Sequence, residues 1–112
     1  MRKFITVRYR IPGFHQWPDA PRGQEYLRNL HRHEFHFTIF LEVFHEDREV
    51  EFIQLKEELV DYTRRTMAEF DNSYSCEMLG DAIVRYLTHV YEGRSAAAWV
   101  EEDGENGAFV TT

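Results

Sequence analysis

Apolar and polar residues alternate along the first part of the chain. Over residues 3–11 the apolar set is Ile5, Val7, Tyr9 and Ile11. Successive side chains of a strand point to opposite faces, so this alternation predicts a half-buried strand, which we expect Pro12 and Gly13 to end. The alternation returns over residues 33–46, where both faces are largely apolar near the middle. A long strand is predicted there, with both faces covered and one of them by another subunit.

From Phe52 the apolar spacing changes to the period of a helix. The residues that recur at this spacing are Phe52, Leu55, Leu59, Tyr62 and Thr66. They predict one helix, and a second is predicted from about Ser75 to Tyr91, with Ser75 as its N-cap and Gly93 after its end. Between the long strand and the first helix, residues 49–52 allow a short returning strand.

The end of the chain has the pattern of a β-hairpin. Residues 96–102 and 108–110 are strand-like, and the turn between them holds Asp-Gly and Asn-Gly dipeptides. Upstream, residues 12–30 form a connection rich in proline and glycine, in which 25–30 favour a short helical turn. The predicted order is therefore ββααββ. The fold class is α+β, a four-stranded antiparallel sheet with two helices on one face, in a single domain over residues 1–112.

Composition and net charge limit the classes of molecule that the protein can bind and the cellular compartment in which we expect it. With 43% hydrophobic residues the chain is globular, and its formal net charge of −7 argues against non-specific binding to nucleic acid. No apolar run approaches the roughly 20 residues of a membrane span, and the first residues lack the apolar region of a signal peptide. Cys76 is the one cysteine, so an intrachain disulfide is excluded and a reducing, cytoplasmic location is expected. Binding of a small anionic ligand is still possible, because a local group of arginines can outweigh the negative net charge. These arginines are Arg8, Arg10, Arg22, Arg28 and Arg32.

Three histidines form the most specific chemical pattern. His31 and His33 are two residues apart at the start of the predicted long strand, so their side chains share one face. His15 lies upstream in the proline-rich connection. Three neutral imidazoles with a fourth position left open are the ligand set of a catalytic zinc site. The alternative interpretation of His31 and His33 is a pair of surface histidines on a strand.

Five stretches occur together in the order known from one protein family. They are His15-Gln16-Trp17-Pro18-Asp19-Ala20-Pro21, Leu30-His31-Arg32-His33, Glu51-Phe52-Ile53-Gln54-Leu55-Lys56, Ser75-Cys76-Glu77-Met78-Leu79, and the hairpin segment from Val100-Glu101-Glu102-Asp103 to Gly107-Ala108-Phe109. With these motifs the chain resembles the 6-pyruvoyltetrahydropterin synthase and 6-carboxytetrahydropterin synthase family over nearly its whole length. The resemblance implies the tunnelling fold, which has the same ββααββ order.

The resemblance also implies a function. It implies a zinc ion on His15, His31 and His33, and a GTP-derived substrate such as dihydroneopterin triphosphate in the biopterin, folate or 7-deazaguanine (queuosine) pathway. It implies lyase-type chemistry, in which zinc acidifies protons beside the substrate's side-chain oxygens. It implies a homo-oligomer, a trimer or hexamer, with sites between subunits.

The resemblance further implies which residues would bind the pterin ring. By resemblance Glu102 would anchor the ring, its carboxylate accepting hydrogen bonds from the ring's amino and N–H groups. Backbone groups near Ser75 and Cys76 would help to hold the ring. As alternatives, Glu102 is a solvated hairpin acid among other acids, and Cys76 is a small packed residue.

Two of the family's proton-transfer groups are absent from this sequence. The family's cysteine position, four residues before the first histidine of the pair, is occupied by Leu27, with Glu25 two residues away. After the first helix, the family's Asp-His pair corresponds to Asp71 followed by Asn72, and an amide cannot act as a general acid or base near neutral pH. Asp71 and Glu25 are therefore the candidate catalytic residues, with a turn residue and a solvent-exposed acid as the alternatives.

Three functions stay open at this point. The first is a zinc-dependent synthase-like lyase with an altered base. The second is a homologue that binds a pterin or purine nucleotide without the usual turnover. The third is an oligomeric structural protein whose histidines no longer hold a metal, which predicts no stoichiometric metal.

Overall fold

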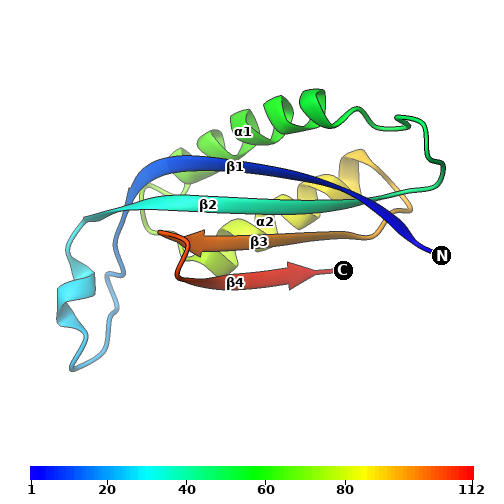
Figure 1. The fold of residues 1–112 in the computed structure, drawn as a ribbon. Coiled ribbons are helices and arrows are strands. Elements are labelled where there is room, and N and C mark those ends of the chain that lie inside the picture. The colour runs from blue at the N-terminus through cyan, green and yellow to red at the C-terminus, as the bar shows by residue number, and fades with distance from the viewer.

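The chain folds into a four-stranded antiparallel sheet with two helices on one face (Figure 1). A computed structural model describes residues 1–112, and its element order is the predicted ββααββ. The bounds are β1 Lys3–His15, η1 Glu25–Arg28 (a short 3-10 helix), β2 His31–Val43, α1 Phe52–Glu69, α2 Cys76–Val90, β3 Ala96–Glu102 and β4 Asn106–Thr111. No helix here has the length and apolar character that a membrane crossing requires.

The sheet has the strand order β1-β2-β3-β4, and every neighbouring pair is antiparallel. α1 packs against β1, while α2 packs against β3 and β4, so both helices cover the same face (Figure 1). Beneath them lie the fully buried side chains of β2: Phe35, Phe37, Ile39 and Leu41. The opposite face carries no helix. Its aromatic side chains line a shallow hollow and are Phe4, Phe40, Trp99 and Phe109.

The prediction that Pro12 and Gly13 end the first strand is wrong, because β1 continues through both to His15. β1 is an edge strand, and the N–H groups on its open side need no ladder partner, so proline is tolerated there. The added residues pair with the start of β2, with His15 opposite His31. His15 therefore lies on a strand rather than in the connection, which is shortened to residues 16–30.

The predicted strand over 49–52 is also wrong, and β2 ends at Val43, three residues earlier than predicted. Two carboxylates explain this. Glu49 accepts a hydrogen bond from the backbone N–H of Phe44 at 2.8 Å, which closes the chain into a turn. Glu51 accepts two backbone N–H groups at 3.1 and 2.8 Å and so caps the start of α1. Both side chains serve the turn and the helix, so no strand forms between them.

The helices and the hairpin are confirmed. α1 continues past Thr66 to Glu69. At the start of α2 the Ser75 hydroxyl accepts the N–H of Met78 at 3.1 Å, as an N-cap does. β3 has the predicted bounds, and the return strand β4 begins at Asn106, two residues earlier than predicted.

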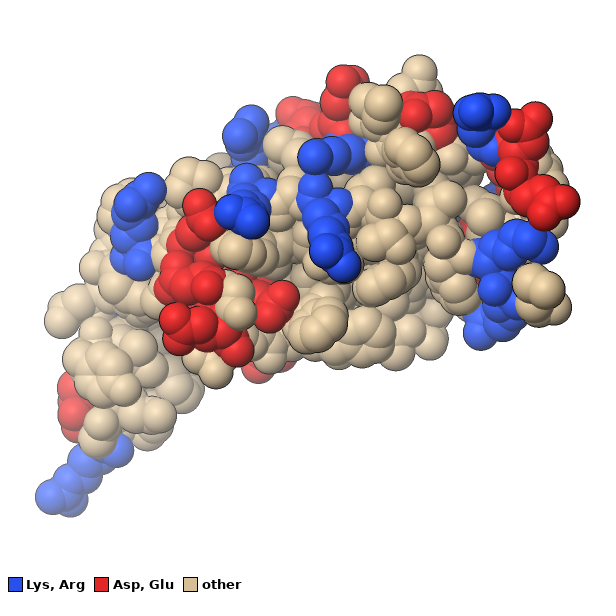
Figure 2. All heavy atoms as spheres, in the orientation of Figure 1, with Lys and Arg blue, Asp and Glu red and all other residues tan.

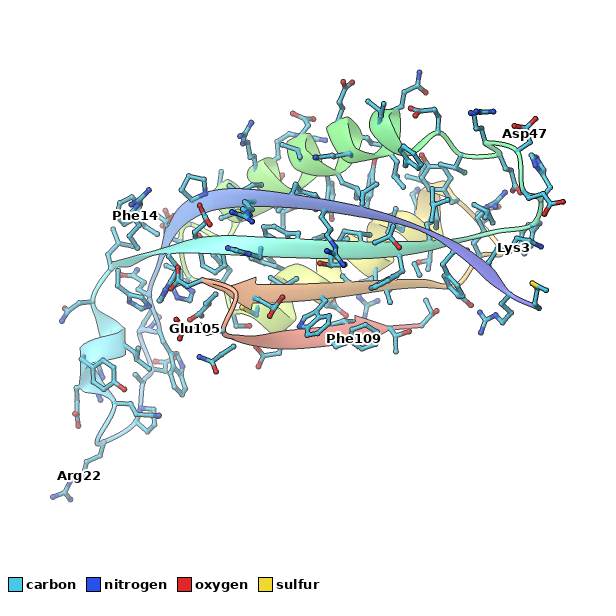
Figure 3. All side chains as sticks on the ribbon, in the orientation of Figure 1. Lys3, Phe14, Arg22, Asp47, Glu105 and Phe109 are labelled. Atoms are coloured by element: carbon cyan, nitrogen blue, oxygen red, sulfur yellow. The ribbon has the colours of Figure 1, made fainter.

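The connection between β1 and β2 projects beyond the end of the sheet, with Arg22 at its tip (Figures 1 and 3). Because of this projection the molecule measures 50 × 24 × 23 Å. The apolar side chains of Trp17, Tyr26 and Leu30 are exposed on it. The connection thus presents apolar surface that the chain itself leaves uncovered.

Candidate metal centre

Strand pairing brings the three histidines together at one end of the sheet. The register places His15 directly opposite His31, and His33 lies two residues further along β2 on the same face. The ring centroids are 4.5 Å apart for His15 and His31, 5.2 Å for His15 and His33, and 5.0 Å for His31 and His33. One potential ligand atom from each ring lies within 4.8 Å of the others. The predicted grouping of the three side chains is therefore shown.

Each ring uses Nδ1 for a hydrogen bond to an oxygen acceptor. The pairs are His15 with the Tyr74 carbonyl at 2.8 Å, His31 with the Asn29 carbonyl at 2.8 Å, and His33 with Asp103 Oδ2 at 2.7 Å. Carbonyls and ionised carboxylates only accept, so in each neutral ring Nδ1 carries the proton and donates it. The Nε2 lone pair of each ring is then left for a ligand. Metal-binding histidines have this arrangement in general.

The Nε2 atom of His15 shows that the site fits a cation. His15 is 8% exposed, and its Nε2 is buried without a hydrogen-bond partner. An unsatisfied buried acceptor is costly, and a metal ion within reach of the triad would satisfy it. Protonation is the other way to satisfy it, but burial lowers the pKa of His15 and disfavours the charged ring. The donor set therefore suits a metal ion.

Glu102, the last residue of β3, faces the same space. Its Oε1 lies 3.4 Å from Nε2 of His15, and its Oε2 lies 3.4 Å from Nε2 of His33. The carboxylate and the two unprotonated nitrogens are all acceptors, so this approach is favourable only with a positive charge among them. Acidic side chains also gather over the β3–β4 turn beside the site, which favours a cation there (Figure 2).

Asp103 holds His33 in place from the β3–β4 turn. Its Oδ2 accepts from His33, and its Oδ1 accepts the backbone N–H of Glu34 at 2.9 Å. Its own N–H donates to the Glu34 carbonyl at 2.7 Å. The Glu34 N–H, and then the bond to His33, hold the pKa of Asp103 below its usual range, so the carboxylate stays ionised.

Tyr74 holds His15 in place from the other side. Its carbonyl accepts from His15, and its buried hydroxyl donates to the carbonyl of Phe14 at 2.7 Å. A Cβ on Gly13 would lie 2.8 Å from this hydroxyl, so the glycine makes room for the bond. Figure 3 shows Phe14 at this end of β1. The turn before α2 is thereby fastened to the end of β1.

The two predicted catalytic carboxylates do not contact the triad. Asp71 lies in the exposed turn after α1 at φ +50°, and its side chain makes no hydrogen bond. Glu25 lies on the exposed face of η1, where its carboxylate accepts the N–H of Gly23 at 2.8 Å. Leu27, which occupies the position where the resemblance would put a cysteine, is half-buried. The structure thus brings together the predicted metal ligands and Glu102, but neither predicted base.

Ser75 and Cys76 begin α2 close to the site. The Ser75 hydroxyl accepts from Met78 and its carbonyl accepts the N–H of Leu79 at 3.1 Å, so its backbone N–H is the group left for other contacts. Cys76 is buried, and burial together with the nearby charge of Glu102 raises the pKa of its thiol to about 12. The thiol is therefore protonated near neutral pH and is not an activated nucleophile.

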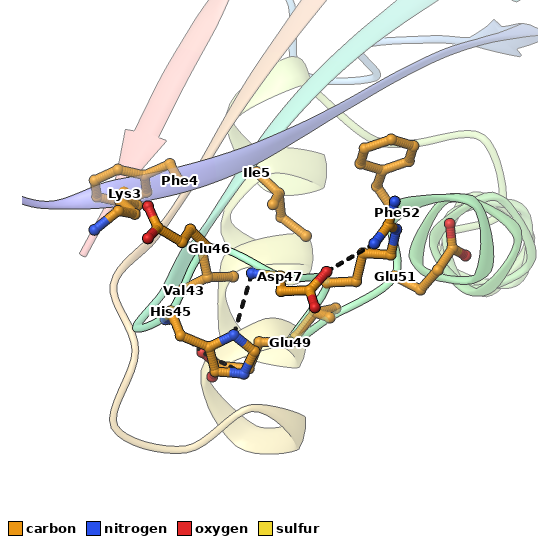
Figure 4. A pocket seen from close by; sticks show the side chains of 12 residues that line it. Lys3, Phe4, Ile5, Val43, His45, Glu46, Asp47, Glu49, Glu51 and Phe52 are labelled. Atoms are coloured by element: carbon orange, nitrogen blue, oxygen red, sulfur yellow. Dashed lines mark hydrogen bonds and ion pairs between the residues drawn. The ribbon is translucent and has the colours of Figure 1, made fainter.

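A second hollow lies at the opposite end of β2, around the turn that follows Val43 (Figure 4). Its polar groups are already paired. His45 accepts the N–H of Asp47 at 3.3 Å, and the carboxylate of Glu49 is bound by backbone N–H groups and by Arg94. No ligand atoms converge there, so the triad end of the sheet is the candidate site.

Sequence reasoning missed the groups that orient the histidines. Tyr74 and Asn29 act through backbone carbonyls, which residue type does not reveal. The contact of Asp103 with His33 could have been predicted, because Asp103 is an acidic residue in the hairpin turn and the hairpin places that turn at the start of β2.

No protein-family model and no curated protein matches this chain. The resemblance to the pterin synthases therefore stays a prediction from the motifs. The geometry itself gives a site of three histidines that can hold a metal ion, on an α+β fold of ββααββ order.

Proposed function

We propose that the protein is a zinc-dependent protein of the 6-pyruvoyltetrahydropterin and 6-carboxytetrahydropterin synthase type, which acts as a lyase on a GTP-derived dihydropterin triphosphate. The observation that carries this proposal is the convergence of three Nε2 lone pairs, each fixed by an Nδ1–H bond. The ββααββ order and the five motifs connect that site with pterin chemistry. The single buried cysteine is consistent with a cytoplasmic location.

Zinc is the proposed ion because of the donor set. Imidazole nitrogens suit zinc among the common divalent ions, although they also bind copper, iron and nickel. When bound, zinc would supply Lewis-acid polarisation of the substrate's side-chain oxygens. Histidines bind a metal ion as neutral ligands, so the triad would leave the positive charge of the ion in place. Their Nδ1 partners keep the rings oriented, so the site needs little rearrangement to bind.

The ring of the substrate would be held by Glu102 and by backbone groups at the start of α2. Glu102 is 30% exposed at the mouth of the site, so its carboxylate can be reached by ring N–H donors. In the connection, Arg28 is engaged by the carbonyl of Ala20, whereas Arg22 and Arg32 are exposed and free for phosphate groups. These positions suit an anionic pterin.

A homo-oligomer, a trimer or hexamer, would complete the site. Both outer strands of the sheet, β1 and β4, have open edges. The face without helices carries exposed aromatic residues, among them Phe109 on β4 (Figure 3). The projecting connection adds exposed apolar side chains beside the triad. Apolar surface of this extent favours burial against further copies of the chain.

A second function, binding of a pterin or purine nucleotide without the usual turnover, is favoured by one observation. No group of the family's kind is placed to accept a proton at the triad. Leu27 replaces the cysteine, and neither Asp71 nor Glu25 contacts the histidines. The metal ligands and the anchor would then serve recognition alone.

The test compares turnover and binding in the same preparations. Zinc-loaded protein is incubated with dihydroneopterin triphosphate and the products are separated by chromatography, while calorimetry measures binding of pterins and guanine nucleotides. His31→Ala removes a ligand, and His45→Ala, at the other end of β2, is the matched control. Turnover that is lost only in His31→Ala supports the synthase. Binding without turnover supports the second function, and absence of both contradicts each proposal.

A further inference from the structure

The carboxylate of Glu102 lies against two of the three histidines. Its two carboxylate oxygens are each 3.4 Å from a different histidine Nε2. On a tetrahedral zinc ion, with bonds of 2.0–2.2 Å, neighbouring ligand atoms lie roughly 3.4 Å apart. Each carboxylate oxygen thus stands at ligand-to-ligand distance from the Nε2 of one histidine, which places the carboxylate next to an ion held by the three histidines, the group whose ligand atoms all lie within 4.8 Å of one another.

From this geometry we infer that Glu102 is the fourth ligand of the metal ion and closes the site until a substrate displaces it. The inference rests on the metal site of the proposed function. In the resting protein Glu102 would bind the metal ion, and it would contact the ring of a substrate only after displacement. The resting site then has three imidazole nitrogens and one carboxylate oxygen as its donors, a combination that zinc accepts.

The backbone holds Glu102 at this place from both sides. It pairs with Phe35 of β2 and with Asn106 of β4, so it sits inside the sheet and not on a free loop. The next residue, Asp103, is itself bonded to His33. A shift of the turn would therefore move Glu102 and His33 together. Glu101 points to the other face of the sheet, so the adjacent carboxylate cannot substitute for it.

If Glu102 fills the fourth position, a substrate can bind to the metal ion only by replacing the Glu102 carboxylate. Substrate oxygens enter only as the carboxylate leaves, and Glu102 is then free beside the bound molecule. There it can accept from ring N–H donors, which reconciles its place on the metal with the anchoring role that the motif implies. A small anion that cannot compete with a tethered carboxylate should be excluded.

The experiment uses cobalt(II) in place of zinc, since its visible spectrum reports the number and type of ligands. Wild-type protein, Glu102→Gln and Glu102→Asp are compared with Glu101→Gln, which removes the same charge from the neighbouring residue. Cobalt affinity is measured by chelator competition, and azide is then titrated into each loaded protein. Circular dichroism checks that each variant keeps its fold.

We expect wild type and Glu101→Gln to share one tetrahedral spectrum that azide does not change. Glu102→Gln should bind cobalt at least about 100-fold more weakly, because loss of a direct ligand should cost no less than loss of an outer-sphere partner, and its spectrum should shift with azide. Glu102→Asp, which keeps the charge but shortens the reach, should behave like Glu102→Gln. Equal affinity and spectra in Glu102→Gln and Glu101→Gln would overturn the inference while leaving the metal site intact. Wild-type protein that binds no stoichiometric cobalt would overturn the metal site and this inference together.

Discussion

Replacement of Asp103 by asparagine tests whether the hydrogen bond to His33 prepares that ring for a metal. The carboxylate serves two donors, His33 Nδ1 at 2.7 Å and the Glu34 N–H at 2.9 Å. Asparagine has one acceptor oxygen, so its amide group must face one of these donors. Asp103 has φ +56°, a conformation that asparagine adopts readily, so the turn itself is kept.

The expected effect is a loss of metal affinity rather than of fold. If the amide donates to His33 Nδ1, the ring must carry its proton on Nε2, and that atom is then no longer a ligand. If the oxygen keeps the bond to His33, the ring loses the negative partner that increases its basicity. Loss of such an outer-sphere partner typically weakens metal binding by about 10–100-fold, and we expect Asp103→Asn to fall in that range.

The assay is competition for zinc against a chromophoric chelator at neutral pH. Glu105→Gln is the matched control, because it removes a carboxylate from the same exposed turn (Figure 3) without contacting a histidine. We expect the control to bind zinc like the wild type. Wild-type affinity in Asp103→Asn would refute the claim that this bond prepares His33.

Three further predictions concern stability. Thr63→Val removes the partner of the buried Tyr9 hydroxyl, which lies 2.8 Å from the threonine oxygen, and should lower the free energy of unfolding by about 1–3 kcal/mol in urea titrations. Leu59→Ala empties a fully buried position between α1 and the sheet and should cost about 2–5 kcal/mol in the same assay. Burial, and then the hydrogen bond to Glu58, raises the pKa of Tyr91 from 10.0 to about 12, so the unfolded chain ionises first and stability should fall as pH rises through that interval. Thermal midpoints measured across this interval should fall less steeply in Tyr91→Phe than in the wild type.

Elements with a regular apolar period could be predicted from the sequence. Both helices and the C-terminal hairpin follow from spacing, caps and turn dipeptides, and the structure has them. The ends of β1 and β2 could not be predicted, because they depend on pairing and on single contacts. Pro12 is tolerated only because β1 lies at the edge of the sheet, and the turn after Val43 is closed by the Glu49 carboxylate.

The same distinction applies to the site. The spacing of His31 and His33 placed them on one face of a strand, and the register then brought His15 opposite His31. The orienting groups could not be deduced in this way, since the carbonyls of Tyr74 and Asn29 are present in every residue type. Whether a carboxylate approaches the triad is also decided by tertiary structure.

The central claim is that His15, His31 and His33 together hold a metal ion. Metal content per chain, determined by mass spectrometry after dialysis against mixed divalent ions, tests it most directly. His15→Ala should lose the ion, whereas His36→Ala, a histidine on the other face of β2 that bonds Glu34 at 2.9 Å, should keep it. We predict one zinc ion per chain in the wild type and in His36→Ala, and none in His15→Ala. A wild-type protein without stoichiometric metal, or equal metal in both variants, would contradict the account.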